Sequence, residues 1–455
     1  MEQTAQIPVR TIDDFFDNEY TEFARYVVAQ RAIPSLIDGF KPSQRKIAYA
    51  ASRLWKTGNE KPMKVFQLGG QAAAMAQFHH GSLDGTIIGM TQEFKNSMPI
   101  FQGIGQFGSL RSPEAGAPRY IGVKFNENFR LLYKDFELAK PKFEEGEEIE
   151  PEFFLPVIPT VLLNGSSGIA VGFATNILNR HPLDLIDSCL LALDGKETQT
   201  LRPWIRGFYG DIEQVAGTHK SWSFRGKWEI KNTTTVEITE IPPSFTYEKY
   251  ESHLDALVER GVLASYDDNS NERVHYVLKF SRSVLAEWIK KDRLGDLLKM
   301  RDGEGENLTT IDENGKLKVF ERAEEIVDYF VKFRLEYYTK RKTRLLVELD
   351  NEIQILTARA RFVKAVIEKE IDVMNVKKVD VMKSIYSIGI NKIDGDYDYL
   401  LSMPIHSLTA EKYAELLKRH SVKTKEREKV EKTSAEDFYR QDLKELRAQV
   451  EKSYV

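Results

Sequence analysis

Residues 103–125, GIGQFGSLRSPEAGAPRYIGVKF, contain the most informative feature of the chain, the pair Arg119-Tyr120. The glycines and prolines around this pair predict a rigid irregular loop rather than a helix. A tyrosine phenol is a poor nucleophile at neutral pH, because its ordinary pKa is about 10. A fixed arginine can stabilise both a phenolate and the phosphate that it attacks. The pair is therefore a candidate nucleophile with its cation, although Tyr120 is one of 19 tyrosines and most tyrosines serve packing.

The composition is typical of a folded, soluble chain with several domains. Its 455 residues exceed one ordinary domain, and contents of 42% hydrophobic and 29% charged residues suit a globular protein. The sequence shows no run of about 18 apolar residues and no secretory signal, which predicts neither a membrane span nor export. The single cysteine, Cys189, excludes an intrachain disulfide and a cysteine-rich metal site and suits a reducing, cytoplasmic compartment.

A local excess of positive charge precedes the arginine–tyrosine pair, although the net charge of the chain is −4. Residues 41–80 contain seven Lys or Arg residues against one acidic residue, and they end in His79-His80. Such a patch is typical of a nucleic-acid contact surface, and a solvated helix face explains the charges equally well. Adjacent histidines without partners at ligand spacing favour phosphate or base contacts over a metal site, and surface histidines without a role stay open.

Two glycine-rich stretches match nucleotide-binding motifs only in part. GIGQFG at 103–108 fits the pattern GxGxxG, but the prolines that follow cannot open the helix which that motif requires. NGSSGIAVG at 164–172 lacks the Gly-Lys-Ser/Thr ending of a phosphate-binding loop. Its small residues would let Ile169 approach DNA and wedge into a base step, and the alternative is an apolar strand that enters a core.

Hydrophobic periodicity predicts an α+β multidomain fold. Residues 1–20 are predicted to form a polar, extended N-terminal arm. Residues 21–150 contain short helical patterns at 44–54 and 67–78, which suit a small helix-turn-helix or winged-helix unit. The acidic run Glu144–Glu152 is predicted to be a surface loop at the edge of that unit.

The second half of the chain changes from strand patterns to long helical ones. Residues 151–320 combine period-two segments such as 234–241 with the helical pattern 247–260, which predicts an α/β domain. From 321 to 455, apolar residues recur at helical spacing, with a globular interruption at about 376–410. This pattern predicts a long antiparallel coiled coil that carries a small globular gate, with a solvated helical tail as the alternative for its returning part.

In their order along the chain, these motifs resemble the DNA cleavage and rejoining region of type IIA DNA topoisomerases, the gyrase A-like family. The resemblance covers about residues 20 to 445. The motifs that carry it are RAIP at 31–34, DGFKP at 38–42, QRK at 44–46, FHHG at 78–81, SPEAGAPRYI at 112–121, PVIPTVLLNGSSGIAVG at 156–172, YLLSMPIHSLTAEKYAEL at 399–416 and TSAEDFYRQDLKEL at 433–446.

The resemblance implies a function and its residues. Tyr120 would attack a DNA phosphodiester to form a reversible 5'-phosphotyrosyl linkage, with Arg119 beside it, so that a second duplex can pass. A winged-helix domain over 21–150 would carry this pair, and a tower domain over 151–320 would carry the DNA-bending Ile169. The DNA contacts implied by the resemblance are Arg31, Lys41, Arg45, Lys46, Lys64, His79, His80 and Ile169.

The resemblance also implies partners. The chain has no acidic cluster beside Tyr120, so no metal ligands are assigned to it, and Mg2+ and ATP are implied on a separate ATPase/TOPRIM subunit. Because one tyrosine cuts one strand of double-stranded DNA, a homodimer through the coiled-coil gate and the winged-helix region is implied.

The branch of the family follows from two motifs and the length of the chain. His79-His80 and Pro118 are more similar to eukaryotic members. Ser82 departs from the family pattern, which has an acidic residue there, and this affects the contacts expected at that position but not the chemistry. Such motifs in a chain this short predict a separate cleavage subunit of the kind that bacteriophages encode, acting in the host cytoplasm.

Two other functions are compatible with parts of the sequence. A non-catalytic, DNA-binding coiled-coil scaffold explains the basic patch and the long helices, but it does not explain the order of motifs around Tyr120. A tyrosine recombinase would need a dispersed Arg/His constellation, which is not recognisable in the chain.

Overall fold

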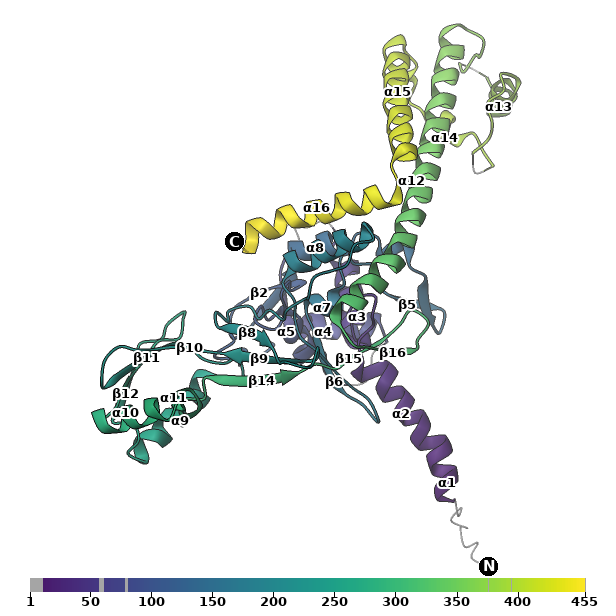
Figure 1. The fold of residues 1–455 in the computed structure, drawn as a ribbon. Helices are drawn as coiled ribbons and strands as arrows, with labels where there is room; N and C mark the ends of the chain where they lie inside the picture. The colour runs from purple at the N-terminus through teal and green to yellow at the C-terminus, as the bar shows by residue number, and fades with distance from the viewer. Residues whose placement is uncertain (1–10, 57–60, 78–80, 375, 394, 455) are drawn as a thin grey trace, which may run out of the picture. The chain divides into compact units, whose positions relative to one another are not determined.

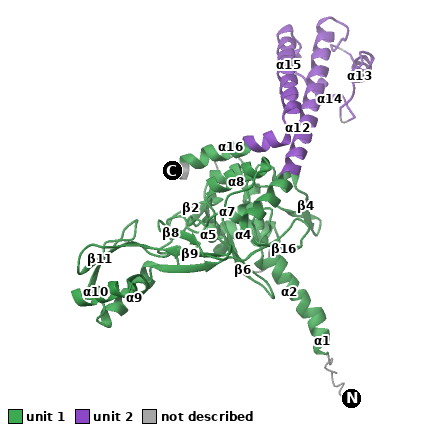
Figure 2. Cartoon of the chain, in the orientation of Figure 1, with its two compact units in different colours: residues 1–334, 442–455 green, residues 335–441 purple. Residues whose placement is uncertain are grey.

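The computed structural model describes residues 11–56, 61–77, 81–374, 376–393 and 395–454. It divides into unit 1, residues 1–334 and 442–455, and unit 2, residues 335–441 (Figure 2). This division does not test the domain boundaries near residues 20, 150 and 320, which stay predictions. Among the described residues, every helix is too short or too polar to cross a bilayer.

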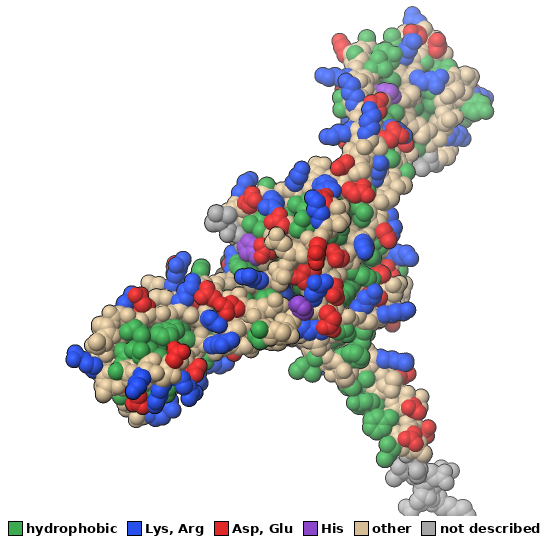
Figure 3. All heavy atoms as spheres, in the orientation of Figure 1, with side chains coloured by type: hydrophobic (Ala, Val, Ile, Leu, Met, Phe, Trp, Pro, Cys, Tyr) green, Lys and Arg blue, Asp and Glu red, His purple; other side chains and the backbone are tan. Residues whose placement is uncertain are grey.

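The N-terminal part of unit 1 is helical. Four short elements follow each other: α1 (Ile12–Phe15), a π-helix (Phe16–Tyr20), α2 (Thr21–Val27) and a second π-helix (Val28–Ala32). The Thr11 hydroxyl caps the first turn by accepting from the Asp14 amide at 3.1 Å. The extended conformation predicted for residues 1–20 is therefore wrong from residue 12 onward. Apolar residues at helical spacing, which the prediction overlooked, line this segment and are exposed (Figure 3): Ile12, Phe16, Tyr20 and Phe23.

Three helices and a three-stranded antiparallel sheet form the part of unit 1 that carries the arginine–tyrosine pair (Figure 1). The helices are α3 (Pro42–Leu54), α4 (Val65–Met75) and α5 (Asp84–Thr91). The strands β1 (Met63–Lys64), β2 (Phe101–Ile104) and β3 (Gly122–Phe125) have the order β1-β3-β2. Pro42 suits the first turn of α3, where its missing N–H costs no hydrogen bond. The helix predicted at 44–54 is confirmed, and the one predicted at 67–78 is confirmed as far as Met75, where α4 ends; residue 78 lies outside the described residues.

The acidic run forms a hairpin instead of the predicted loop. Strand β4 (Pro141–Glu144) pairs with β5 (Glu147–Pro151) around a turn in which Glu145 and Gly146 have φ values of 50° and 88°. Such positive φ values at both central residues favour a tight hairpin turn. The Tyr49 hydroxyl donates to Glu148 at 3.1 Å, so the carboxylate of Glu148 helps to hold the hairpin against α3. The prediction failed because it weighed the charge run above the turn signal of Gly146 within the run.

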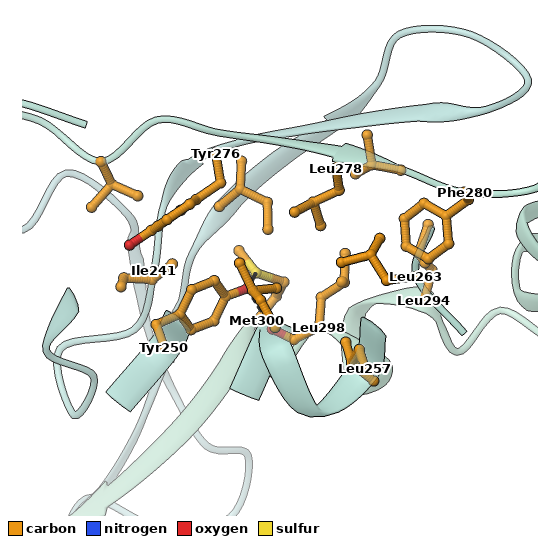
Figure 4. Packing of buried hydrophobic residues seen from close by; sticks show 14 of the residues in the cluster. Ile241, Tyr250, Leu257, Leu263, Tyr276, Leu278, Phe280, Leu294, Leu298 and Met300 are labelled. Atoms are coloured by element: carbon orange, nitrogen blue, oxygen red, sulfur yellow. Dashed lines mark hydrogen bonds between the residues drawn. The ribbon is translucent and has the colours of Figure 1, made fainter. Parts of the chain in front are cut away.

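The middle of unit 1 is built from two more sheets. Strands β10 (Lys227–Ile230), β11 (Thr235–Glu240), β12 (Ser265–Asp268) and β13 (Tyr276–Lys279) have the order β10-β11-β13-β12. An apolar core lies between this sheet and the helices α9 (Tyr247–Glu259), α10 (Arg282–Lys290) and α11 (Leu294–Leu297), and it includes Tyr250, Leu278 and Met300 (Figure 4). The second sheet contains β8 (Asp211–Gln214), β9 (Ser221–Arg225) and β14 (Arg301–Gly305). The strand and helix predicted at 234–241 and 247–260 are confirmed.

Shorter elements connect these parts of unit 1. They are α6 (Glu127–Leu132), a 3-10 turn (Phe136–Leu138), α7 (Thr160–Leu163), the hairpin of β6 (Ser166–Ile169) and β7 (Ala174–Ile177), α8 (Pro182–Leu193), and the hairpin of β15 (Leu308–Ile311) and β16 (Leu317–Phe320). The Asn176 and Asn307 backbones exchange hydrogen bonds of 2.9 Å, which joins β7 to the segment before β15.

Unit 2 contains two long helices side by side, α12 (Ala323–Ile367, from residue 335) and α15 (Ala410–Lys432). Polar contacts between them include Lys342 to Glu431 at 2.9 Å, Asp350 to Arg427 at 2.6 Å and Glu352 to Lys423 at 3.0 Å. Later positions in α12 meet earlier ones in α15, so the helices are antiparallel. A small core packs α13 (Lys378–Ser387) and α14 (Asp398–Leu401) against α12.

The returning helix of the prediction is two helices in the structure. α15 ends at Lys432, and α16 (Ala435–Tyr454) begins after an extended Thr433. The Ser434 hydroxyl accepts from the Asp437 amide at 3.0 Å, as an N-cap residue does. Helical periodicity continues through this Thr-Ser pair, so the pattern alone did not reveal the break.

Candidate functional site

Tyr120 lies at the surface of unit 1, two residues before β3. Its side chain is 71% exposed, and the Arg119 guanidinium lies 5.2 Å from the centre of its ring. The Tyr120 amide donates to the Ala117 carbonyl at 2.9 Å and closes a turn that presents both side chains. The structure thus places a permanent cation against an exposed phenol, which is the arrangement that the sequence predicted for attack on a phosphate.

The start of α4 holds the chain on either side of the pair. The Lys64 ammonium donates to the Tyr120 carbonyl at 2.7 Å. The Val65 and Phe66 amides donate to the Ile121 and Pro118 carbonyls at 3.2 and 3.3 Å. Lys64, predicted as a DNA contact, therefore fixes the tyrosine backbone and also places its charge within the same surface.

Arg111 anchors the beginning of the loop. Its buried guanidinium lies 2.5 Å from the Glu240 carboxylate and donates to the carbonyls of Ile241, Pro242 and Phe245 at 2.6, 2.9 and 2.7 Å. Burial lowers the pKa of Arg111, and the Glu240 carboxylate opposes that shift. Sequence reasoning missed this role, because nothing in the pattern connects residue 111 to residue 240.

The loop has neither helix nor strand between residues 105 and 121, which confirms the predicted irregular conformation. Gly108 has a φ of 81°, and a Cβ there would lie 2.7 Å from the Pro113 backbone. Only glycine fits this tight crossing of the loop. The tyrosine is therefore held by a loop that is fixed at both ends, and whose backbone at Gly108 packs closely against its backbone at Pro113.

Ile169 lies at the tip of the β6–β7 hairpin. Its side chain is 89% exposed, and Phe173 across the turn is also exposed. The Ala170 amide donates to the Phe173 carbonyl at 2.8 Å, and Gly172 has a φ of 76°. The alternative of a strand that enters a core is excluded by this exposure. An apolar tip on a stiff hairpin is a form suited to insertion between base pairs.

Lys41 supports this hairpin. Its ammonium donates to the Ser167 carbonyl at 2.6 Å, and burial lowers its pKa. A Cβ at Gly168 would lie 2.1 Å from the Ala32 carbonyl oxygen and 3.2 Å from the Lys41 ammonium, so only glycine lets the hairpin approach these groups closely. Lys41 was predicted as a DNA contact, and the structure assigns it a hydrogen bond to Ser167, two residues before Ile169.

Arg45 corrects a sequence prediction. It was expected to contact DNA, but its side chain is buried, with Nε and Nη2 at 2.7 and 3.1 Å from the Asp38 carboxylate. Burial tends to lower its pKa, and the carboxylates of Asp38 and Glu150 overcome this effect and raise it. A guanidinium that is taken up in the core cannot bind a phosphate outside, so Arg45 serves the fold.

The other predicted DNA contacts have different surroundings. The half-buried Lys46 donates to the Ala76 carbonyl at 2.6 Å, whereas Arg31 is exposed on the wall of a surface cavity of about 290 Å³ that also includes Ser82. His79 and His80 lie outside the described residues. Among the residues that are described, no three His, Cys, Asp or Glu side chains gather as the ligands of a metal ion would.

Comparison with known proteins shows which family the chain belongs to. The family model for the A subunit of DNA gyrase/topoisomerase IV matches residues 31–445. The chain belongs to this family. The gyrase A-like resemblance drawn from the motifs is thereby confirmed.

Relatives of the topoisomerase family differ in how much of their length this chain spans. The DNA topoisomerase medium subunit of Enterobacteria phage T4 is 32% identical over 97% of this chain and 100% of its own length. The mitochondrial DNA topoisomerase 2 of Dictyostelium discoideum is also 32% identical over 97% of the chain, but the chain spans only 35% of that protein.

The fold of this topoisomerase-family chain matches a solved structure. The Plasmodium falciparum topoisomerase II DNA-binding, cleavage and re-ligation domain superposes with a TM-score of 0.85 and 31% identity, over 96% of this chain and 64% of the other. The mixed α and β fold is therefore that of this domain.

Proposed function

We propose that this chain is the DNA cleavage and rejoining subunit of an ATP-dependent type II DNA topoisomerase. The observation that carries the proposal is the exposed Tyr120 with the Arg119 guanidinium against its ring, in a loop fixed at both ends. Membership of the gyrase/topoisomerase IV family supplies the substrate, double-stranded DNA.

The proposed reaction is a reversible transesterification. The Tyr120 oxygen attacks the phosphorus of a DNA phosphodiester, the bond to the 3'-oxygen breaks, and a 5'-phosphotyrosyl bond forms. The proton lost by the Tyr120 hydroxyl is balanced by the proton that the released 3'-oxygen takes up to become a hydroxyl. In the reverse step that hydroxyl attacks the phosphotyrosine and restores the strand. Because one ester replaces another, rejoining needs no additional energy source. Arg119 stabilises the negative charge that develops on the phosphoryl oxygens.

The surrounding elements have proposed roles in the same reaction. The group of α3–α5 with β1–β3 acts as the winged-helix domain, with Arg31, Lys46 and Lys64 toward the DNA backbone. The β10–β13 region acts as the tower domain, and the antiparallel pair of α12 and α15 acts as the coiled coil of the exit gate. A homodimer supplies the second tyrosine, and Mg2+ and ATP belong to an ATPase/TOPRIM partner subunit.

The test of this function is to identify the residue that becomes linked to DNA. The complex with its co-purifying ATPase subunit is incubated with supercoiled DNA and Mg2+, denatured during cleavage, and digested with nuclease and trypsin. Cleavage after Arg119 and Lys124 releases residues 120–124, and we expect the nucleotide mass on this peptide. A nucleotide on another peptide would refute the role of Tyr120. DNA binding without any adduct would favour the non-catalytic scaffold instead.

Removal of the Arg119 cation is expected to slow cleavage strongly. Arg119→Ala should reduce the single-turnover cleavage rate by about 100- to 1000-fold, as loss of one well-placed donor to a developing oxyanion does. Arg119→Lys should fall between, because it keeps the charge but loses the planar fork. Arg273, whose guanidinium lies 4.6 Å from the Tyr209 ring, offers a matched control, and Arg273→Ala should leave the rate unchanged. A rate within threefold of wild type for Arg119→Ala would contradict the role.

The exposed Ile169 is expected to bend DNA. Ile169→Ala should lower the bend of a duplex labelled at both ends, measured by fluorescence energy transfer, while DNA binding is retained. Lys41→Met should have a smaller effect in the same direction, because it removes the hydrogen bond to Ser167 that positions the hairpin. Ile289, an exposed isoleucine on α10, provides the control Ile289→Ala. An unaltered bend in the Ile169 variant would refute the wedge.

A further inference from the structure

Phe66 has an exposure that packing does not explain. It is the second residue of α4, and its side chain is 63% exposed. Burial of a phenylalanine side chain contributes about 1.5–3 kcal/mol to folding, so a core position for this ring would be favourable. The neighbours Val65 and Leu68 are fully buried, which shows that the helix has a core face and that Phe66 lies away from it.

The backbone places Phe66 beside the arginine–tyrosine pair. The Phe66 amide donates to the Pro118 carbonyl at 3.3 Å, and the Lys64 ammonium donates to the Tyr120 carbonyl at 2.7 Å. The first turn of α4 and the end of the loop therefore lie against each other. Phe66 is at the same surface as the proposed nucleophile, although more than fifty positions separate them in the sequence.

A sheet row extends this surface. Gly122 of β3 pairs with Lys64 on one side and with Ile104 of β2 on the other. Side chains of directly paired residues lie on the same face of a sheet, and Ile104 is exposed. We call the set Lys64, Phe66, Ile104, Arg119 and Tyr120 the tyrosine patch.

The tyrosine patch has the chemistry of a DNA contact. Within the described residues, neither Lys64 nor Arg119 has a carboxylate in ion-pair distance, so both charges are available to phosphates. An exposed aromatic ring on the same surface as such cations gains by stacking on a base, which is worth a factor of about ten or more in affinity per base. Phe66 and Ile104 offer nothing to a phosphate, so their partners are bases or deoxyribose.

We propose that Phe66 contacts the base step beside the phosphate that Tyr120 attacks and sets which DNA sites are cleaved. This inference rests on the proposed cleavage function and deepens it. Base steps differ in how easily they unstack, so an aromatic ring that presses against one base step makes sequences with an easily unstacked step better substrates than others. The cations of the tyrosine patch hold the backbone of any sequence, whereas Phe66 distinguishes between sequences.

The test is a map of cleavage sites. The complex with its ATPase subunit is trapped on end-labelled DNA of mixed sequence, and each site is expressed as a fraction of all adducts. Phe66→Ala should change the ratio between strong and weak sites by about tenfold, because base steps differ in the free energy needed to unstack them, with the changes confined to bases next to the cut. Phe143, which is 64% exposed on β4, provides the control, and Phe143→Ala should keep the wild-type ranking of sites.

Each outcome separates the two proposals. If wild type forms no adducts, the cleavage function itself fails. If wild type cleaves and Phe66→Ala keeps the same site ranking, the role of Phe66 is overturned. If Phe66→Ala gives no adducts at all, Phe66→Leu decides: adducts with the wild-type ranking overturn the proposal, because a similar volume then suffices, and adducts with a changed ranking support it. An equal change in Phe143→Ala would also overturn it.

Discussion

A Tyr120→Phe variant is expected to form no covalent adduct with DNA. The substitution removes only the phenolic oxygen and keeps the ring that Arg119 covers at 5.2 Å. No other oxygen can take over at that position, so cleavage should fall by at least about 10⁴-fold, as it does when an enzyme loses its nucleophile. DNA binding should persist, because the cations around the site are untouched. Denaturation of the trapped complex followed by gel analysis measures adducts, and fluorescence anisotropy measures binding.

The control for this variant is Tyr209→Phe. Tyr209 is 54% exposed and carries the Arg273 guanidinium 4.6 Å from its ring, so it reproduces the arginine–tyrosine stack without the loop. Adducts should form normally in that variant. Adduct formation at the wild-type level in Tyr120→Phe would contradict the assignment of Tyr120 as the nucleophile. Loss of adducts in both variants would show that the effect of removing a phenolic oxygen is not specific to Tyr120.

The second large effect is expected from Asp38→Asn, and it concerns stability. Asp38 is completely buried. Its carboxylate accepts from Nε and Nη2 of Arg45 at 2.7 and 3.1 Å, and from the amides of Phe40 and Phe154 at 3.0 Å each. The substitution leaves the buried Arg45 charge without its main partner. Breaking a buried pair in this way costs about 3–5 kcal/mol of unfolding free energy. Urea unfolding followed by tryptophan fluorescence should show the loss, because all tryptophans lie in unit 1.

A surface pair gives the comparison for Asp38. Glu287 on α10 lies 2.5 Å from Lys291, which follows the helix, and both side chains are exposed. Glu287→Gln should therefore change the unfolding free energy by less than about 1 kcal/mol. The double variant Asp38→Asn/Arg45→Met should recover part of the loss, since it removes the unpaired charge as well. A loss below about 1 kcal/mol in Asp38→Asn would contradict the structural role of the pair.

The sequence predicted the tyrosine loop and several of the longer helices, because these depend on local patterns. Glycine and proline spacing identified the irregular chain around Tyr120, and apolar periodicity identified α3, α4, α9 and α12. Predictions that depend on the burial of a side chain failed. The sequence pattern does not distinguish a basic residue at the surface from one in the core, so Arg45 was predicted as a DNA contact. The one available signal was Asp38, seven residues earlier, which could have suggested a buried partner.

Long-range contacts were outside the reach of pattern reasoning. Nothing in the residues near position 111 indicates Glu240, and no local signal reveals that Lys64 binds the Tyr120 carbonyl or that Lys41 binds the Ser167 carbonyl. Resemblance to a family transfers residue names but not these contacts. They had to be taken from the fold, and they changed the interpretation of Lys41 from a phosphate contact to a support of the Ile169 hairpin.

The anchoring of Arg111 also limits how the chain can be shortened. The guanidinium finds its acceptors at Glu240, Ile241, Pro242 and Phe245. A fragment that stops before residue 240 would retain Tyr120, Arg119 and Lys64, and it would nevertheless leave a charged side chain without the acceptors it was folded around. Transplanting the loop into another scaffold meets the same difficulty. The smallest autonomous piece that keeps the tyrosine in place therefore extends well past the helices beside it, at least to the start of α9.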